Sequence, residues 1–271
     1  MDGSDLAVSY STRGSFAIIT LNSPRKLNAL TSRQWYRLAS IMQEIDCLDS
    51  ILVTVLTGKG RYFSAGADIS NPQPQTDPDT RRRWLQNFVA TNFYLTHAFS
   101  THSKILVAAL NGPAIGGSAA VAAFADFIYA APHTFILTPF ASLGLVAEVG
   151  TSQTLVQRLG IPLANEAMLM GRKISAAELV GCGFATKIIN IEEGDDPKFL
   201  HLVMNELGER FGDHLNHECL LQIKALRQKP QRDVLALQNV AEVFAGWERL
   251  TSGAVEKEMG KIRSGEKRHK L

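Results

Sequence analysis

The sequence predicts an α/β fold followed by a helical carboxyl-terminal region. Short apolar, β-branched runs alternate with stretches in which apolar residues recur at helical spacing. Several of these runs are almost continuously apolar, which is typical of strands buried on both faces of a sheet. The chain has 271 residues, of which 45% are hydrophobic and 20% charged. This composition supplies enough apolar material for one large core and argues against intrinsic disorder.

The first elements form a β-α-β unit. Residues 16–21 and 51–57 are predicted to be strands. Between them, five apolar residues recur at helical spacing: Trp35, Leu38, Ile41, Met42 and Ile45. Four more strands are expected farther along the chain, at 104–110, 127–130, 135–138 and 186–189.

Helix signals fill the rest of the chain. Residues 71–78 contain three prolines and are expected to be an exposed loop, ahead of a helix that carries Trp84, Phe88 and Leu95. Ser175 and Glu178 have the spacing of a capping box and mark another helix start. We therefore divide the chain into a core at 1–195 and a helical region at 196–271, whose apolar residues at helical spacing are Leu202, Leu207, Phe211, Leu220, Val234, Leu237 and Phe244.

Composition excludes several classes of function. A net charge of +2 does not by itself indicate a nucleic-acid partner, and the runs at 81–83 and 257–270 are interpreted as solvated basic surface. The three cysteines lie far apart and predict neither disulfides nor a metal site, which suits a reducing compartment. No apolar run reaches the roughly 18–20 residues of a membrane span, and the first residues lack a secretory pattern. We expect a soluble protein that is not secreted.

The last three residues, His269, Lys270 and Leu271, resemble the Ser-Lys-Leu signal that the peroxisomal import receptor binds. Histidine stands where that signal has a small residue. Basic residues precede the tripeptide, as suits an exposed tail. We expect a peroxisomal matrix location.

Two glycine-containing turns follow predicted strands, FSAGAD at 63–68 and NGPAIGGSAA at 111–120. A strand that runs into a helix start leaves unpaired N–H groups, and small residues allow a ligand oxygen to approach them. Two such turns facing one point would form an oxyanion hole. Neither turn has the phosphate-loop pattern or a complete dinucleotide-binding fingerprint, which argues against nucleotide chemistry.

These motifs resemble the crotonase (enoyl-CoA hydratase/isomerase) superfamily. The resemblance rests on NSPRKLNAL at 22–30, on the two glycine turns and on GRKISAAE at 171–178, and it spans roughly residues 8–190. It implies the crotonase, ClpP-like fold, in which repeated β-β-α turns form a spiral core and the carboxyl-terminal helices mediate trimerisation. It also implies a homotrimer or hexamer that acts on fatty-acyl-CoA thioesters.

The resemblance assigns roles to individual residues. The N–H groups of Ala67 and Gly117 match the two oxyanion donors of the superfamily. The CoA part of the substrate is expected against two short segments, through Arg25, Lys26, Ala29, Ala65, Gly66, Ala67, Asp68 and Ile69. Arg25 or Lys26 is a candidate partner for a CoA phosphate. No separate cofactor is implied, since coenzyme A is part of the substrate.

The acid/base residues distinguish the reactions of the superfamily. The paired glutamates of hydratases would fall at Ala120 and Phe140, whose side chains can neither activate water nor supply a proton. Glu148 is the only Asp, Glu, Lys or Arg from Phe127 through Gln157, so we expect a desolvated carboxylate with a raised pKa.

The position of Glu148 is similar to that of the single catalytic glutamate in fungal peroxisomal Δ3,Δ2-enoyl-CoA isomerases. Such a base would move a proton from C2 to C4 of a cis or trans 3-enoyl-CoA and form trans-2-enoyl-CoA. Asn92 is similar to an asparagine that orients this base. Other readings remain open at this point: a dienoyl-CoA isomerase, a hydratase with relocated groups, or a non-catalytic CoA- or RNA-binding scaffold.

Overall fold

The computed structural model describes residues 7–69 and 78–267. Its centre is a six-stranded sheet in the order β1-β2-β3-β4-β6-β9. The first two strands pair antiparallel, and the other neighbours pair parallel. The strands are β1 (Val8–Arg13), β2 (Phe16–Leu21), β3 (Val53–Gly58), β4 (Ile105–Leu110), β6 (Phe127–Ala130) and β9 (Lys187–Ile188).

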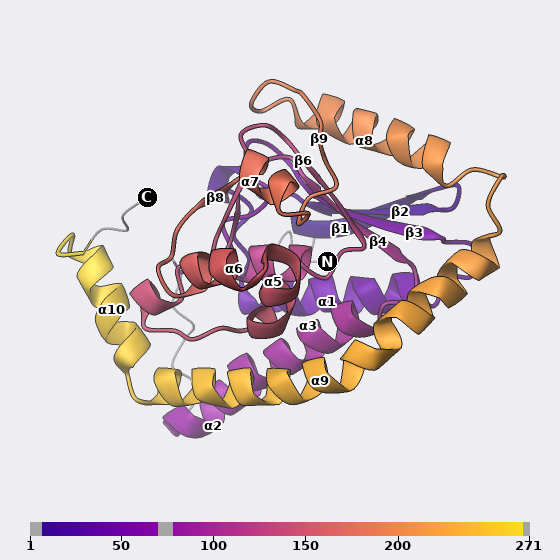
Figure 1. The fold of residues 1–271 in the computed structure, drawn as a ribbon. Coiled ribbons are helices and arrows are strands. Elements are labelled where there is room, and N and C mark those ends of the chain that lie inside the picture. The colour runs from indigo at the N-terminus through magenta and orange to yellow at the C-terminus, as the bar shows by residue number, and fades with distance from the viewer. Residues whose placement is uncertain (1–6, 70–77, 268–271) are drawn as a thin grey trace.

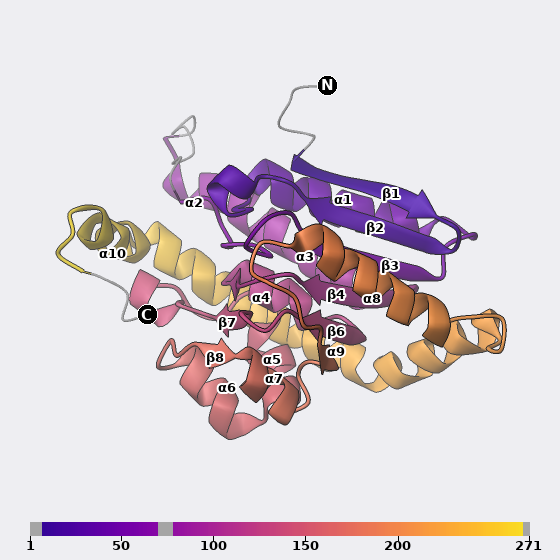
Figure 2. The ribbon, with the colours of Figure 1, turned by 90° about the horizontal axis from the view of Figure 1, so that it is seen from above.

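Helices cover both faces of this sheet. One face packs against α1 (Ser32–Asp46), α3 (Ala90–Thr101) and α4 (Gly117–Ala122), and the other packs against α8 (Asp196–Arg210). Figures 1 and 2 show the sheet between these layers. In β3 the side chain of Leu56 enters the first layer, while Val53 and Val55 enter the second. Every residue of β3 and β4 is buried, so the prediction of strands buried on both faces is confirmed.

A smaller sheet continues the fold. It has the order β5-β7-β8, formed by β5 (Ala114–Ile115), β7 (Phe135–Leu137) and β8 (Ile174–Ser175). Around it lie α5 (Thr151–Leu159), α6 (Ile161–Met168) and α7 (Ala176–Gly181). The predicted capping box begins α7, because the Ser175 hydroxyl accepts from the Glu178 N–H and Glu178 accepts from the Ser175 N–H.

The helix predicted around Trp84, Phe88 and Leu95 is present, with a local irregularity. It begins as α2 (Thr80–Trp84), passes through one π-helical turn at Leu85–Val89 and continues as α3. A π-turn inserts extra backbone into a helix and changes the direction of its side chains. Residues 71–77 of the predicted proline loop lie outside the described part of the chain.

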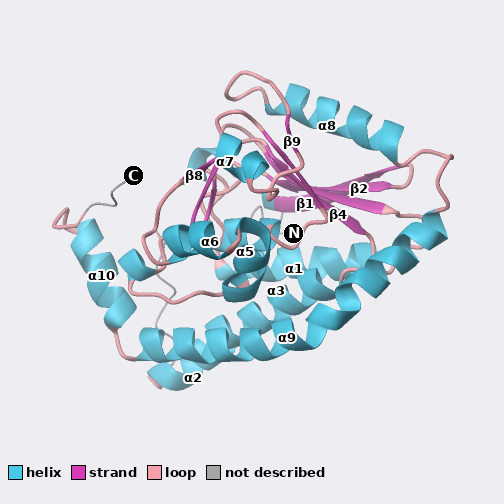
Figure 3. Ribbon diagram, in the orientation of Figure 1, coloured by secondary structure: helices cyan, strands magenta, loops and turns pink. Residues whose placement is uncertain are grey.

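The helical carboxyl-terminal region is confirmed and consists of α8, α9 (His217–Thr251) and α10 (Ala254–Arg263). Figure 3 shows these three as helix joined only by loops. The long helix α9 runs along the outside of the molecule and contacts α2, α3 and α5 (Figure 1). None of the described helices has both the length and the apolar character of a membrane span.

The inner side of α9 is unusually polar. Its buried residues are Lys224, Asn239, Glu242, Val243 and Gly246. By contrast, Val234, Leu237 and Phe244, which follow the predicted helical spacing, are 52%, 74% and 43% exposed. Hydrogen bonds and ion pairs therefore contribute much of the contact between α9 and the core.

One of these contacts is an ion pair between Lys224 on α9 and Asp126 in the turn before β6. The Lys224 ammonium lies 2.8 Å from Asp126 and donates to the Lys104 carbonyl at 2.5 Å. Asp126 also accepts from the Leu106 N–H at 2.8 Å and pairs with Arg227. Both Lys224 and Asp126 are almost fully buried at the side chain, so each depends on the other for compensation of its charge.

Replacing Asp126 by alanine should destabilise the protein by about 3–5 kcal/mol, because Lys224 keeps its buried charge and loses its counterion. Urea unfolding measures the loss. Glu256→Ala, which breaks an exposed pair with Arg263, is the matched control and should leave the midpoint unchanged. Equal midpoints for the two variants would contradict this account of the pair.

Candidate active site

The two glycine turns predicted to act together lie side by side. Ser64 donates its N–H to the Pro113 carbonyl at 3.2 Å, and Ser64 accepts from the Ile115 N–H at 3.0 Å. The Ser118 hydroxyl donates to the Ser64 carbonyl at 2.8 Å. These three hydrogen bonds hold the two glycine turns against each other.

Gly66 makes this close approach possible. A Cβ atom at Gly66 would lie 2.4 Å from the Ile115 carbonyl oxygen, nearer than any side-chain carbon can come. The residue also has φ of +85°, in the left-handed region that favours glycine. The glycine of FSAGAD is therefore required by the contact between the turns as well as by its own backbone conformation.

Each turn offers one free backbone N–H group. Leu30 pairs with the first turn by donating to the Gly66 carbonyl and accepting from Asp68, which leaves the Ala67 N–H facing away from this pairing. Gly117 is the first residue of α4, where N–H groups have no partner within the helix. Among the described residues, neither N–H has a hydrogen-bond acceptor. Two such donors on adjoining turns can stabilise an oxyanion.

Glu148 lies beside the second donor. Its Oε1 is 3.9 Å from the point that a Cβ atom on Gly117 would occupy, and the Trp35 ring lies 3.3 Å from the same point. The carboxylate, the indole and the start of α4 therefore border one small space. Burial, together with the negative charge of Glu242, raises the pKa of Glu148 to about 7. A carboxylate with this pKa can both accept and return a proton near neutral pH.

The backbone beside Glu148 is strained and tightly held. The Thr151 hydroxyl donates to the Glu148 carbonyl at 2.6 Å and lies 3.1 Å from its N–H. The next residue, Val149, has φ of +56° although it is β-branched. Such a conformation costs about 1–3 kcal/mol and persists only where surrounding contacts hold it.

The two positions that the resemblance assigns to the glutamates of hydratases carry no acid or base. Ala120 is completely buried and Phe140 is 3% exposed, both within apolar surroundings. Asn92 is also buried, on α3, but no hydrogen bond joins it to Glu148, and its Oδ1 has no partner among the described residues. Its expected role in orienting Glu148 stays a prediction.

The two segments expected to bind CoA are brought together. Ala65 donates its N–H to the Leu27 carbonyl at 2.9 Å, which joins the segment 25–29 to the segment 65–69. Lys26 pairs with Asp68 at 2.9 Å across this junction. Arg25 is exposed beside it, Ala29 is half-buried and Ile69 is 53% exposed.

Two further residues shape this region, although their sequence pattern does not indicate it. Asn28 is fully buried with φ of +55°, and its amide donates to the Lys59 and Tyr62 carbonyls at 2.9 and 2.8 Å. It thereby ties the segment 25–29 to the strand end that precedes the first turn. Trp35 follows the predicted apolar spacing of α1, and its position beside Gly117 also makes its ring part of the lining of the site.

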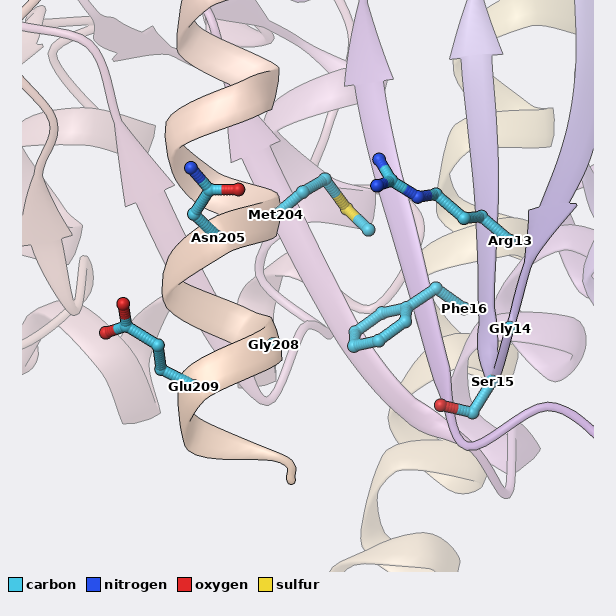
Figure 4. A pocket seen from close by; sticks show the side chains of 8 residues that line it. All are labelled: Arg13, Gly14, Ser15, Phe16, Met204, Asn205, Gly208 and Glu209. Carbon is cyan, nitrogen blue, oxygen red and sulfur yellow. The ribbon is translucent and has the colours of Figure 1, made fainter. Parts of the chain in front are cut away.

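A hollow of about 610 Å³ lies elsewhere, between α8 and the turn that joins β1 to β2. Figure 4 shows Phe16 and Met204 pointing into it, with Arg13 at its side. None of the predicted site residues lines this hollow, so we do not assign the active site to it. Within residues 7–69 and 78–267, no cluster of three metal-ligating side chains is present.

Comparison with known proteins identifies the family. Residues 11–197 match the family model described as enoyl-CoA hydratase/isomerase. The chain belongs to this family. The match includes both glycine turns, Glu148 and the whole central sheet from β2 onward, so the predicted crotonase superfamily is confirmed.

Full-length relatives in fungi support the same family. A Delta(3,5)-Delta(2,4)-dienoyl-CoA isomerase of Pyricularia oryzae is 51% identical, and the alignment covers 96% of this chain and 97% of that protein. Two proteins of Saccharomyces cerevisiae, a Delta(3,5)-Delta(2,4)-dienoyl-CoA isomerase and a 3,2-trans-enoyl-CoA isomerase, are 34% and 32% identical. Each of these two alignments covers 97% of this chain, and they cover 98% and 96% of the respective relatives.

Solved structures confirm the crotonase fold. The crystal structure of an enoyl-CoA hydratase/isomerase from Pseudoalteromonas atlantica superimposes with a TM-score of 0.83 at 23% identity, over 98% of this chain and all of the other. Pseudomonas aeruginosa OdaA gives a TM-score of 0.80 at 24% identity, over 94% and 98% of the two chains.

Replacing Gly117 by proline should lower turnover by about a hundredfold or more, because proline removes the N–H while fitting the first position of a helix. Gly117→Ala is the control, since it keeps the N–H and adds a Cβ close to Trp35. Steady-state kinetics on 3-enoyl-CoA, with circular dichroism to verify folding, compares the two. Equal, near-normal turnover in both variants would remove this N–H from the mechanism.

Proposed function

We propose that this chain is an enoyl-CoA isomerase that converts 3-enoyl-CoA to trans-2-enoyl-CoA, with Glu148 as its single base. The observation that carries the proposal is the raised pKa of Glu148 at a point 3.9 Å from the Cβ position of Gly117. The family of the chain supports an acyl-CoA substrate. The apolar residues at positions 120 and 140 argue against hydration.

In this mechanism the thioester oxygen accepts hydrogen bonds from the N–H groups of Ala67 and Gly117. Glu148 takes a proton from C2, and the electron pair of that C–H bond forms the new C2–C3 double bond through a dienolate whose charge resides on the thioester oxygen. The protonated Glu148 then delivers the same proton to C4 as the old double bond breaks. Each donor contributes about 2.7–4 kcal/mol to stabilising the charged intermediate. The proton removed from C2 is the one added to C4, so this mechanism requires no cofactor.

A second candidate is the isomerisation of 3,5-dienoyl-CoA to 2,4-dienoyl-CoA. The 51% identical relative from Pyricularia oryzae carries that name, which favours this reading. The chemistry differs in the last step, because the proton from C2 must reach C6 instead of C4. The two candidates therefore differ in how far Glu148 would have to carry the proton, and the relative turnover of the two substrates distinguishes them.

Glu148→Gln preserves the shape of the side chain and removes the base. Isomerisation of 3-enoyl-CoA should therefore fall by at least roughly a hundredfold, while binding of acyl-CoA is retained. Conjugation and hydration are followed separately with 3-enoyl-CoA, 3,5-dienoyl-CoA and 2-enoyl-CoA.

Faster turnover of 3,5-dienoyl-CoA by the wild type would support the second candidate. Hydration of 2-enoyl-CoA would indicate a hydratase with relocated groups. Binding without any turnover would indicate a scaffold. If the folded Glu148→Gln variant retains more than about a tenth of wild-type activity, Glu148 is not the base.

We further propose a homotrimer or a hexamer, as the family resemblance implies. Large apolar side chains on the described surface, such as Leu169, Met170 and Leu237, are 71%, 77% and 74% exposed and would gain from burial between subunits. Sedimentation equilibrium distinguishes the two assemblies from a monomer.

We also propose a peroxisomal matrix location, through binding of the import receptor to His269, Lys270 and Leu271, which lie outside the described residues. The fungal relatives are consistent with a role in β-oxidation. Deleting the tripeptide from a tagged protein should leave its activity intact and shift it to the cytosol. Fluorescence microscopy in cells that lack untagged copies checks this, and unchanged peroxisomal import would contradict it.

A further inference from the structure

A buried carboxylate on α9 contacts the loop that carries Glu148. Glu242 is 5% exposed and accepts from the Gly150 N–H at 2.7 Å and from the Ser152 N–H at 2.8 Å. The Ser152 hydroxyl donates to the same carboxylate at 2.5 Å and accepts from the Gln238 amide at 2.8 Å. Gly150 and Glu242 are 92 residues apart in the sequence, so this contact depends on the docking of α9.

Glu242 supplies the cap that α5 lacks. The cap residue of this helix is Gly150, which has no side chain to accept from the free N–H groups of the first turn. Both oxygens of Glu242 accept from N–H or O–H donors, which favours the ionised carboxylate, while burial raises the pKa of this group above its usual value. A negative charge is also favoured at a helix amino terminus.

The cap determines the conformation of the residues that precede it. Thr151 lies between the two residues whose N–H groups bind Glu242, and its hydroxyl holds the Glu148 backbone. Val149, between Glu148 and this cap, keeps its left-handed conformation only while both of its neighbours are held. Release of Gly150 and Ser152 would let Val149 relax toward a common conformation and swing Glu148 away from Gly117.

From these contacts we infer that Glu242 is a positioning residue for Glu148, anchoring the loop 148–152 so that the Glu148 carboxylate faces the amino terminus of α4. The inference rests on the proposed function, in which Glu148 is the base. Glu242 does not itself touch the substrate in this assignment. It couples the long helix α9 to the geometry of the reaction.

The charge of Glu242 has a second effect, on the pH dependence. Trp35 from α1, Gly117 from α4 and Thr151 from α5 lie near Glu148 and carry no charge, whereas Glu242 from α9 is the charged group that acts on its pKa. Burial is the larger cause of the raised pKa of Glu148, and the charge of Glu242 adds to it. The base must be ionised to act, so wild-type turnover should rise with pH through a midpoint near 7. Removing the charge lowers this midpoint.

The experiment compares three variants of the full chain. Glu242→Ala removes the anchor, and Glu242→Gln keeps one acceptor oxygen without the charge. Lys224→Met is the control, because it removes another buried charged contact of α9 at a distance from Glu148. The values of kcat and KM for 3-enoyl-CoA are measured from pH 5.5 to 9 for each folded variant, alongside Glu148→Gln.

We expect Glu242→Ala to lower kcat by about tenfold to a hundredfold with KM changed less than about threefold, since the base is displaced and the CoA contacts are not. Glu242→Gln should recover part of kcat, and its midpoint should fall below that of the wild type because the charge that raises the pKa of Glu148 is gone. Lys224→Met should keep the wild-type midpoint and most of kcat. If Glu242→Ala fails to fold, the kcat and pH midpoint of Glu242→Gln, compared with those of Lys224→Met, test the inference.

The inference would be overturned by unchanged kcat in the Glu242 variants, an effect on KM alone, an equal loss in Lys224→Met, or an unshifted midpoint in Glu242→Gln. A loss restricted to 3,5-dienoyl-CoA would make Glu242 a proton-transferring group and would also overturn it. High activity in Glu148→Gln refutes the proposed function instead, so the two failures are distinguishable.

Discussion

The hydrogen-bonded junction between Ser64 and the segment 113–118 is the constraint on which the site depends. It brings together two turns that are about fifty residues apart in the sequence, and it does so at the ends of neighbouring parallel strands β3 and β4. Because the strands are buried on both faces, they cannot shift to relieve a change in the turns. A side chain at Gly66 would force the turns apart and separate the Ala67 and Gly117 N–H groups.

Much of the fold could be predicted from the sequence, because the central strands are continuous apolar runs. All six predicted strands exist, with ends displaced by at most two residues. The structure adds β1, β5 and β8. The first of these is an edge strand with mostly polar, solvent-facing residues, so it lacks both the apolar run and the strict alternation that predict strands. The other two have two residues each and exist only through pairing with β7.

For the candidate site, the sequence alone indicates the properties that depend on local chemistry. Glu148 stands alone among apolar neighbours, so its raised pKa follows from the sequence as well as from the structure. Glu242 gave no such signal, because a glutamate within a long charged helix is most often solvated. Only the packing of α9 against α5 reveals that it is buried. For Asn92 the structure gives burial but no contact with Glu148, so that role rests on resemblance.

The polar inner face of α9 also limits how the helix can dock. An apolar face tolerates small slips, whereas a shift of one helical turn would leave Lys224 and Glu242 buried against groups that cannot compensate their charges. These buried charges therefore restrict α9 to essentially one register against the core. During synthesis, the growing chain holds Ala67, Gly117 and Glu148 long before Glu242 is added. A ribosome-bound or truncated chain that ends before α9 thus contains every group to which we assign a part in the reaction, but lacks the helix that we infer positions Glu148.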